Sequence, residues 1–447
     1  MDNQKELKEE KISKLLLKYS IPAILAMMVT ALYNTVDRAF IGSMKGVGAL
    51  AISGLGVTMP LFTILGAFCV AIAIGGSTNI AIKLGEGNKD EAEKILGSTF
   101  ALEFIVAIAL MVISFIFLDN ILYIFGASSN TISYARDYIS IIIFGAWFNL
   151  PGFALNSAIR AEGRPKLAAT MMITTCILNL ILDPIFIFIF NMGIKGAALG
   201  TIICQLVVFI WGTYYFTIGK SNLKLRIKNI RVDSKIVRAI LLIALTPFFM
   251  ELAAGFIHLI TNRVLKVYGG DIAIGAMTTV TSISLMFLMP VFGLSQGMQT
   301  IIAYNHGAKQ YHRTRKTLVY AIVAGTLILT IGLFIIGVFK LELIQLFTAD
   351  DKLIKLASEG ISLYSITLPI IGISILGAVY FQCIGSAKIS MVLGILRQVI
   401  LLVPAILIIP KFLGLNGVWI SQPVADAGSA TIIGILLFRE FRKYKCE

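Results

Sequence analysis

Long apolar runs, each of about 20 residues or more, recur along the whole 447-residue chain and are separated by short basic segments. A helical run of that length matches the hydrocarbon thickness of a bilayer. Hydrophobic residues make up 57% of the chain and charged residues only 14%, whereas soluble domains carry about 25% charged residues. This pattern excludes an ordinary soluble enzyme and predicts an all-α membrane protein that crosses the bilayer many times.

The apolar runs predict about twelve transmembrane helices. The expected spans are residues 15–42, 49–82, 94–118, 131–159, 166–190, 194–217, 236–265, 271–304, 316–339, 353–383, 388–410 and 415–438. One long basic linker, residues 220–235, divides them into two blocks of six. We therefore expect an N-lobe over residues 1–219 and a C-lobe over residues 236–447.

The two halves share residues at a near-constant spacing, which indicates an internal duplication. Pro22 and Arg38 recur 225 residues later as Pro247 and Arg263. At a spacing of 222, Gly75, Thr78, Ala81, Gly85 and Leu96 recur as Gly297, Thr300, Ala303, Gly307 and Leu318. Because six spans are an even number, both six-helix bundles enter the membrane in the same orientation, related by a pseudo-two-fold axis along the membrane normal. Alternating-access carriers have this architecture, and no ring motif of a channel is present.

The formal net charge of +14 indicates orientation. Lys and Arg fall mostly on every second connection, as the positive-inside rule describes. A nucleic-acid-binding protein would instead gather its basic residues on one soluble face. We therefore expect a multi-pass protein of the cytoplasmic membrane, in contact with lipid and not with nucleic acid, with both termini in the cytoplasm. The five cysteines show no paired spacing, so neither a disulfide nor a metal site is indicated.

Charged residues inside apolar runs are functional candidates, because burying a charge at mid-membrane costs roughly 2.5 kcal/mol or more. In the first span Tyr33 and Asp37 lie four residues apart and share one helix face, with Asn34 beside them. An alternative is that Asp37 pairs with Arg263 and only pins two helices together. These three polar residues nevertheless mark the first span as a candidate ion site.

The fifth and sixth spans repeat this spacing. Asn179 and Asp183 lie one turn apart, and Pro184 removes an amide donor that would otherwise bond about one turn earlier. Thr201 and Gln205 are also four residues apart. If the three faces converge, their oxygens suit a Na⁺-like ion, and mutually repelling carboxylates suit a proton. Simple interhelical hydrogen bonding is the alternative for Asn179 and Thr201.

The C-terminal half lacks the acidic pair at the equivalent positions, so the ion chemistry should be one-sided. It offers Glu251 and His258, which lie seven residues apart on one helix face. A cavity-lining Glu251 would attract cationic substrates; the alternative is an acid hydrogen-bonded to His258. Met286 and Met289 suit either an adaptable binding wall or a lipid-facing surface.

Three further charges within apolar runs are assigned no role in ion binding. Arg397 and Asp426 are expected to form a structural pair or to line a cavity as polar groups. Glu103 is expected to face other helices, and its role is open.

Several motifs in order resemble the MATE family, the multidrug and toxic compound extrusion transporters. They are Pro22, ALYNTVDRAFIG over residues 31–42, GGSTN over 75–79, LGEGN over 84–88, AEGRPK over 161–166, LNLILDP over 178–184 and MGIKGAALGT over 192–201. The resemblance covers nearly the whole chain. It implies twelve spans in two lobes and export of hydrophobic, often cationic compounds against inward H⁺ or Na⁺ flow.

The resemblance also implies residue roles. The residues that match the family's N-lobe cation site are Asp37, Asn179, Asp183 and Thr201, with Tyr33 and Asn156 beside it. Glu251 matches an acid that another branch uses in its C-lobe. The partnering aspartate of that branch is missing, with Ser374 near its expected place, so the N-lobe site is the one we expect to work.

We therefore expect a monomeric secondary active antiporter with no cofactor, coupled to H⁺ or Na⁺ and exporting small hydrophobic or cationic compounds. If the ion is Na⁺, its ligands would be Asp37, Asn179, Asp183 and Thr201. The expected substrate cavity comprises Asn156, Gln205, Glu251, His258, Met286 and Met289.

Two alternatives are weaker on the sequence. A flippase for a lipid-linked polar headgroup would favour a cavity rich in Arg and Lys, but only Arg38, Arg263 and Arg397 lie in or at the ends of apolar runs. A membrane-embedded enzyme would need a nucleophile with a base or a metal-ligand spacing. The three histidines offer neither, so we expect no enzyme.

Overall fold

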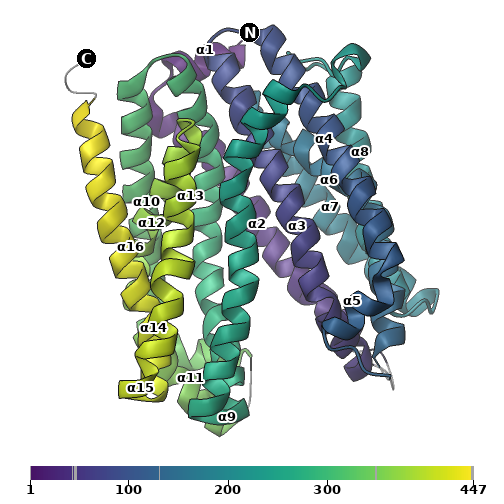
Figure 1. Cartoon of the computed structure of the whole chain (residues 1–447), viewed down its shortest axis with the longest axis vertical. Helices are drawn as coiled ribbons and strands as arrows, with labels where there is room; N and C mark the ends of the chain where they lie inside the picture. The colour runs from purple at the N-terminus through teal and green to yellow at the C-terminus, as the bar shows by residue number, and fades with distance from the viewer. Residues whose placement is uncertain (1, 43, 45–47, 130, 348–349, 444–447) are drawn as a thin grey trace. The chain divides into compact units, whose positions relative to one another are not determined.

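The computed structural model describes residues 2–42, 44, 48–129, 131–347 and 350–443, and these residues form helices and connections without strands. The first half contains α1 (Asp2–Glu9), α2 (Ile12–Gly42), α3 (Gly48–Gly85), α4 (Lys89–Ile116), α5 (Leu118–Ile124), α6 (Ile132–Ala161), α7 (Pro165–Pro184), the π-helix η1 (Ile185–Ile189), α8 (Ile194–Thr217) and the 3₁₀-helix η2 (Ile227–Asn229). The second half contains α9 (Ser234–Gly307), α10 (Tyr311–Gln345), α11 (Asp351–Tyr364), α12 (Leu368–Cys383), α13 (Ala387–Ile395), the π-helix η3 (Leu396–Leu402), α14 (Val403–Ile408), α15 (Pro410–Leu413) and α16 (Leu415–Lys443) (Figure 1).

The described helices account for the expected membrane spans. Eleven segments of the described chain are long and apolar enough to cross a bilayer, and the pair α11 and α12, bent at 57°, gives a twelfth when it is counted as one span. α9 supplies two spans, because Gly270 adopts a left-handed conformation (φ 66°) that separates Ser234–Gly270 from Ile272–Gly307. The prediction of an all-α protein with about twelve transmembrane helices is confirmed.

Two spans contain a stretch of π-helix next to a proline. α7 ends at Pro184 and continues as η1, while η3 runs into α14, whose second residue is Pro404. Proline has no N–H to donate to the carbonyl one turn earlier, so the regular α-helical bonding is interrupted at both places. The second break supplies residues that line a cavity described below, and the first follows directly on Asp183.

Contacts divide the chain into two compact units. Unit 1 comprises Met1–Glu10, Leu25–Glu251 and Gly307–Lys309, and unit 2 comprises Lys11–Ile24, Leu252–His306 and Gln310–Glu447. The start of α2, as far as Ile24, therefore belongs with the second half of the sequence. The start of α9, as far as Glu251, and the basic linker belong with the first half.

This exchange of helix ends is reciprocal, as the contacts of two glycines that recur between the halves show. In unit 1, a Cβ at Gly75 would overlap the carbonyl oxygen of Ile240 in α9. In unit 2, a Cβ at the equivalent Gly297 would lie 2.5 Å from Ser20 Oγ in α2. Both glycines let the first helix of the other half approach the backbone closely.

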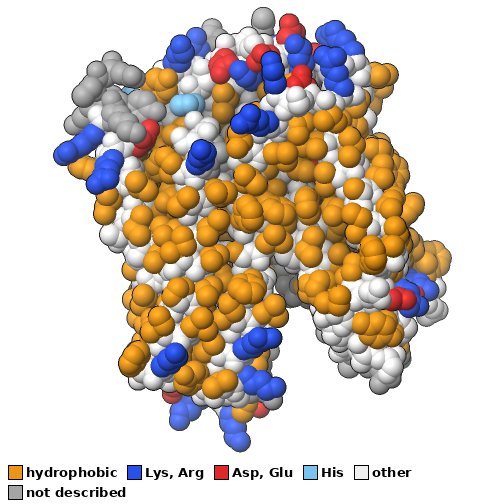
Figure 2. Space-filling view, in the orientation of Figure 1, with side chains coloured by type: hydrophobic (Ala, Val, Ile, Leu, Met, Phe, Trp, Pro, Cys, Tyr) orange, Lys and Arg blue, Asp and Glu red, His pale blue; other side chains and the backbone are white. Residues whose placement is uncertain are grey.

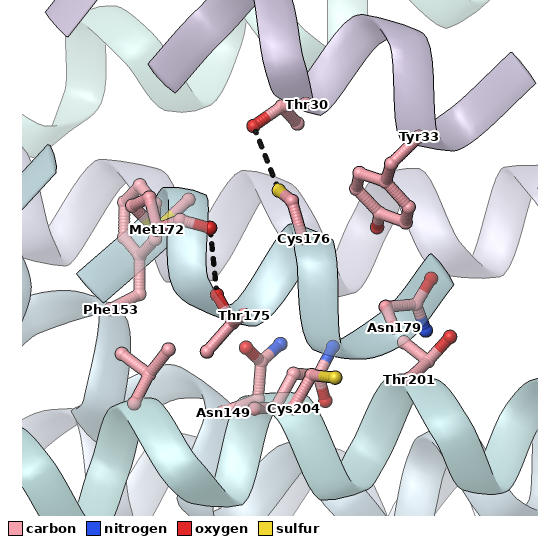
Figure 3. A pocket seen from close by; sticks show the side chains of 12 residues that line it. Thr30, Tyr33, Asn149, Phe153, Met172, Thr175, Cys176, Asn179, Thr201 and Cys204 are labelled. Carbon is pink, nitrogen blue, oxygen red and sulfur yellow. Dashed lines mark hydrogen bonds between the residues drawn. The ribbon is translucent and has the colours of Figure 1, made fainter. Parts of the chain in front are cut away.

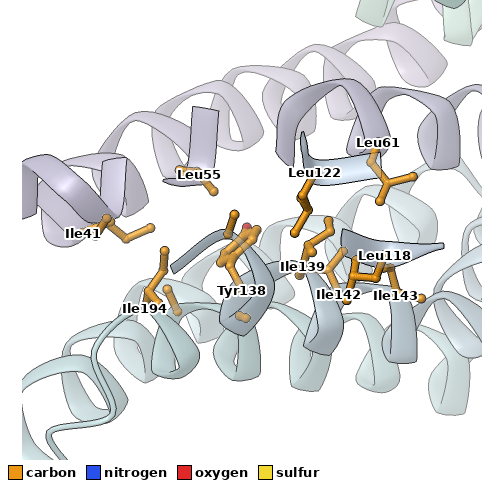
Figure 4. Packing of buried hydrophobic residues seen from close by; sticks show 14 of the residues in the cluster. Ile41, Leu55, Leu61, Leu118, Leu122, Tyr138, Ile139, Ile142, Ile143 and Ile194 are labelled. Carbon is orange, nitrogen blue, oxygen red and sulfur yellow. The ribbon is translucent and has the colours of Figure 1, made fainter. Parts of the chain in front are cut away.

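Unit 1 is packed around α6, and its outer surface is apolar. Buried side chains of α2, α3, α5, α6 and α8 interleave in one cluster, which includes Ile41, Leu55, Leu61, Leu118, Leu122, Tyr138, Ile139, Ile142, Ile143 and Ile194 (Figure 4). Hydrophobic side chains also cover the sides of the helices, with Lys and Arg gathered mainly near the helix ends (Figure 2). An exposed apolar belt of this kind suits contact with lipid.

The basic linker is docked on unit 1 by two buried acids. The Glu162 carboxylate accepts hydrogen bonds from Ser221 Oγ (2.8 Å) and from the backbone N–H groups of Asn222 and Leu223. Glu93 accepts a bond from the Lys224 backbone N–H over 3.1 Å. Burial raises the pKa of Glu162, which lies outside the spans, and the bonds from Ser221 and the two backbone groups oppose that shift.

Candidate functional site

A cavity of about 150 Å³ lies within unit 1, between α2, α6, α7 and α8. Its lining includes Thr30, Tyr33, Asn149, Cys176, Asn179, Thr201, Cys204 and Gln205. Figure 3 shows the Tyr33 ring on α2 directed towards Asn179 on α7 and Thr201 on α8. Side chains from the first, fifth and sixth spans thus meet at one place.

Two carboxyl groups lie beside this cavity without lining it, next to Tyr33 and Asn179 of its wall. Asp183 is fully buried (0% exposed) and Asp37 is 8% exposed. The two carboxyl groups interact directly, and the Tyr33 hydroxyl lies close enough to interact electrostatically with both of them. Asn179 Nδ2 donates a hydrogen bond to Asp183 Oδ1 over 3.0 Å. The structure therefore brings together the residues that the sequence pattern placed on three separate helix faces.

The close approach of α8 to α7 depends on Gly200. A Cβ at this position would overlap Asp183 Oδ1. The next residue, Thr201, donates its hydroxyl to Ala197 O over 3.1 Å, so its oxygen is oriented by its own helix. Any larger residue at 200 would push the Asp183 carboxylate out of its present place.

Several buried oxygens of the site have no hydrogen-bond donor in the described part of the chain. They are Asn179 Oδ1, Asp183 Oδ2 and Gln205 Oε1. Buried polar atoms are normally satisfied, and a carboxylate away from water is costly unless it is neutralised. Oxygen atoms arranged around a small cavity suit a proton or a hard cation such as Na⁺. The cavity is smaller than typical pockets for drug-sized ligands, which are about 300 Å³ or larger.

One residue expected in the site is placed differently. Asn156 does not line the unit 1 cavity; its Nδ2 donates to Ala168 O over 3.0 Å and its Oδ1 accepts from Arg160, which ties α6 to α7. The side chain of Asn34 lies outside the described residues. Gln205, in contrast, lines the cavity as the spacing to Thr201 predicts.

The residues expected to form a substrate cavity do not all share one. Glu251 is exposed and ends the α9 segment of unit 1. His258 lines a second cavity, of about 340 Å³, within unit 2. Met286 is 50% exposed, and neither it nor Met289 lines either of these two cavities. Spacing along one helix could not show which of these faces meet a cavity and which meet lipid.

The remaining buried charges occupy defined places. Arg397 Nη1 lies 3.3 Å from Asp426 Oδ1, as expected for a pair, and Arg397 also lines the unit 2 cavity. Glu103 is fully buried and faces other helices, as expected. Thr30 and Cys204 line the unit 1 cavity but were not predicted. Thr30 precedes Tyr33 by three residues and Cys204 follows Thr201 by three, which is the spacing that could have indicated them.

In the described residues, a helical fold of about twelve spans with a cavity partly lined by polar side chains inside its first unit is typical of polytopic membrane transporters. A model of the MatE family matches residues 22–185 and 247–407. The chain therefore belongs to the MatE family, which confirms the resemblance. The two matched segments begin at the two prolines that recur at a spacing of 225, so each half of the duplication carries one copy.

Relatives and solved structures cover almost the whole chain. The multidrug export protein MepA of Staphylococcus haemolyticus is 26% identical over 432 residues, which is 96% of this chain and 94% of the relative. MepA of Staphylococcus aureus is 26% identical over 429 residues, with 96% and 94% covered. An outward-facing multidrug resistance MATE family transporter of the MOP superfamily is similar in structure, with a TM-score of 0.93 and 22% identity over 99% of this chain and 98% of that one. A MOP superfamily transporter from Pyrococcus furiosus also gives a TM-score of 0.93, at 22% identity over 98% of both chains.

Proposed function

We propose that this protein is a secondary active antiporter of the cytoplasmic membrane that exports small hydrophobic, cationic compounds in exchange for H⁺ or Na⁺. The observation that carries the proposal is the meeting of Asp37 and Asp183 beside Asn179, which lines a cavity of about 150 Å³. Family membership and relatives that are multidrug export proteins support the export of drugs.

The unit 1 cavity supplies the ion-coupling step of this proposal. Two interacting carboxyl groups cannot both stay charged in a buried place without a compensating cation. A proton shared by Asp37 and Asp183 would remove that repulsion, and so would a Na⁺ held by Asp37, Asn179, Asp183 and Thr201. Ion binding then stabilises the arrangement of α2, α7 and α8 described here, and ion release destabilises it. An equilibrium between two conformations responds to a ligand only through such a difference in affinity.

The direct test is transport in proteoliposomes with a fluorescent lipophilic cation. A pH gradient and a Na⁺ gradient are imposed separately, and we expect one of them to drive transport. Asp37→Asn and Asp183→Asn should abolish the gradient-driven component, while Asp137→Asn, a matched change at an exposed acid of unit 1 that pairs with Lys195, should preserve it. Transport driven by neither gradient, or undiminished in Asp37→Asn, would overturn the proposal.

We propose further that the protein works as a monomer with both termini in the cytoplasm. The alternation of Lys and Arg between connections supports this orientation. A fluorescent reporter that matures only in the cytoplasm, fused after Glu447, should be fluorescent. An exported phosphatase fused at the same place should be inactive; the opposite pair of results would reverse the orientation.

A further inference from the structure

The unit 2 cavity has the form of a small-molecule site. Its volume of about 340 Å³ falls within the range of ligand pockets, roughly 300–1,000 Å³. Much of its wall is apolar and includes Leu285, Leu288, Phe292 and Leu402. A small set of polar side chains converges on the same space, among them His258, Tyr364, Arg397, Gln398 and Gln422. Binding sites for amphipathic ligands are usually apolar cavities with a few oriented polar groups.

Arg397 gives this wall a positive charge. It is the only Lys, Arg, Asp or Glu among the described lining residues. Its partner Asp426 is fully buried and does not line the cavity, whereas the Arg397 side chain is 19% exposed. Arg397 therefore reaches the cavity wall, while its partner carboxylate lies away from the cavity.

Asp426 holds Arg397 in position through a small network. Its Oδ1 accepts one bond from Arg397 Nη1 over 3.3 Å and another from Gln422 Nε2 over 3.0 Å. The Tyr364 hydroxyl lies close enough to interact electrostatically with both Asp426 and Arg397. Arg397 lies in η3, and π-helical stretches in helices often accompany functional sites. An arginine fixed from behind in this way is pre-organised for a ligand at its front.

The N–H groups of Arg397 that do not bond to Asp426 determine which kind of ligand can bind. A guanidinium carries five N–H donors, and in the described part of the chain Arg397 uses one of them, to Asp426. The remaining donors match the geometry of a carboxylate, which arginine binds in a bidentate manner. A simple cation, in contrast, would be repelled by Arg397 unless it also carried an acid.

We propose that the unit 2 cavity binds amphipathic small molecules that carry a carboxylate, with the carboxylate on Arg397 and the hydrocarbon part against Leu288 and Phe292. This inference rests on the proposed export function and deepens it, because it adds anionic and zwitterionic compounds to the cations exported. It also gives the two units different roles, since unit 1 binds the coupling ion and unit 2 binds the acid group of a substrate.

A matched pair of fluorescent probes tests the site without any gradient. Dansylglycine carries a carboxylate, and dansylglycinamide differs only by replacing it with a neutral amide. Binding to the purified full chain in nanodiscs is followed by dansyl fluorescence. We expect dansylglycine to bind about tenfold or more tightly than the amide, as a charge-assisted hydrogen bond should provide. Equal affinity for the two probes would overturn the proposal.

The variants are chosen so that loss of folding does not mimic loss of the site. Arg397→Gln alone leaves the Asp426 carboxylate buried without its partner, which is strongly destabilising. The Arg397→Gln/Asp426→Asn double variant removes both charges, keeps the shape of the side chain at 426 and leaves a shorter polar side chain at 397. It should bind dansylglycine about tenfold or more weakly while binding the amide as before. Unchanged dansylglycine affinity in the double variant would refute the site.

Arg263→Gln is the matched control, because Arg263 is an exposed arginine on α9 that does not line the cavity. It should retain the affinity for dansylglycine; a loss equal to that of the double variant would reject the assignment to Arg397. Nanodiscs of phosphatidylglycerol and of phosphatidylcholine distinguish a lipid occupant. Competition by the anionic lipid alone would assign the cavity to a headgroup and overturn the proposal.

The outcome is separable from that of the proposed function. Dansylglycine binding is measured at equilibrium, so it needs no ion gradient and no transport. Gradient-independent transport together with carboxylate-selective binding would reject the antiporter and keep the site. Gradient-driven cation transport without carboxylate selectivity would keep the antiporter and reject the site.

Discussion

Asn179 donates a hydrogen bond to Asp183 across one turn of α7, over 3.0 Å, and this bond uses only one polar atom of each side chain. Asn179 Oδ1 and Asp183 Oδ2 stay buried without a donor in the described part of the chain. The bond therefore fixes the two side chains so that two oxygens are left for a cation or a proton. Pre-organised ligands of this kind raise affinity because little ordering is needed on binding.

Replacing Asn179 should weaken the ion site without disrupting the fold. Asn179→Ala removes one ligand oxygen and the bond that orients Asp183. Loss of such a hydrogen bond to a charged group corresponds to about 1.5–3 kcal/mol, so the ion concentration for half-maximal transport should rise roughly tenfold or more. The measurement is transport in proteoliposomes at graded pH or Na⁺. Asn120→Ala, at an exposed amide of α5 that does not line this cavity, should leave that concentration unchanged; an equal shift would refute the assignment.

Gly200 should be intolerant of even one added carbon. In Gly200→Ala the new Cβ would overlap Asp183 Oδ1, and overpacking of this kind costs about 1–3 kcal/mol. We expect a lower unfolding temperature in detergent and a loss of stabilisation by the coupling ion. Gly66→Ala is the control, because a Cβ there meets no atom within 4 Å. An unfolding temperature as high in Gly200→Ala as in Gly66→Ala would contradict the close packing of α7 and α8.

The convergence at the unit 1 cavity could be predicted because a polar face is rare inside a membrane helix. Tyr33 with Asp37, and Asn179 with Asp183, each mark one face, and apolar surroundings leave such faces only each other to contact. Asn156 shows the limit of this reasoning. Its amide ties α6 to α7 instead of lining the cavity, and a lone polar residue on a helix gives no sign of which use it has.

The exchange of helix ends between the units could not be predicted in this way. Ser20 and Gly297 lie in different halves of the sequence but in the same unit. Lipid tails are as apolar as a neighbouring helix, so the sequence of a span does not record which neighbour it packs against. The recurrence of Gly75 and Gly297 was visible as a repeat, but only the structure shows what the two glycines contact.

The docking of the basic linker should depend on pH through Glu162. Because burial raises its pKa in the folded protein, the protonated form is favoured by folding, and this contribution is present at low pH and lost as pH rises through the raised value. The wild type should therefore lose stability relative to Glu162→Gln as pH rises from about 4 towards neutrality. Unfolding temperatures in detergent across that range provide the measurement. Glu359→Gln, at an exposed acid of α11, is the control, and a stability difference for Glu162→Gln that is constant with pH would exclude the effect.

The reciprocal packing of α2 and α9 predicts matched effects in the two halves. Gly75→Leu would drive a side chain into the backbone of Ile240, and Gly297→Leu would drive one into Ser20. Each should destabilise its own unit by about 1–3 kcal/mol, seen as a lower unfolding temperature. Gly255→Leu should have little effect, because a Cβ on that glycine of α9 meets nothing within 4 Å. If only one of the two variants were destabilised, the exchange would not be reciprocal. If neither were, the helix ends would not pack as described. Equal destabilisation of both would support the reciprocal packing, in which Gly75 contacts the start of α9 and Gly297 contacts the start of α2.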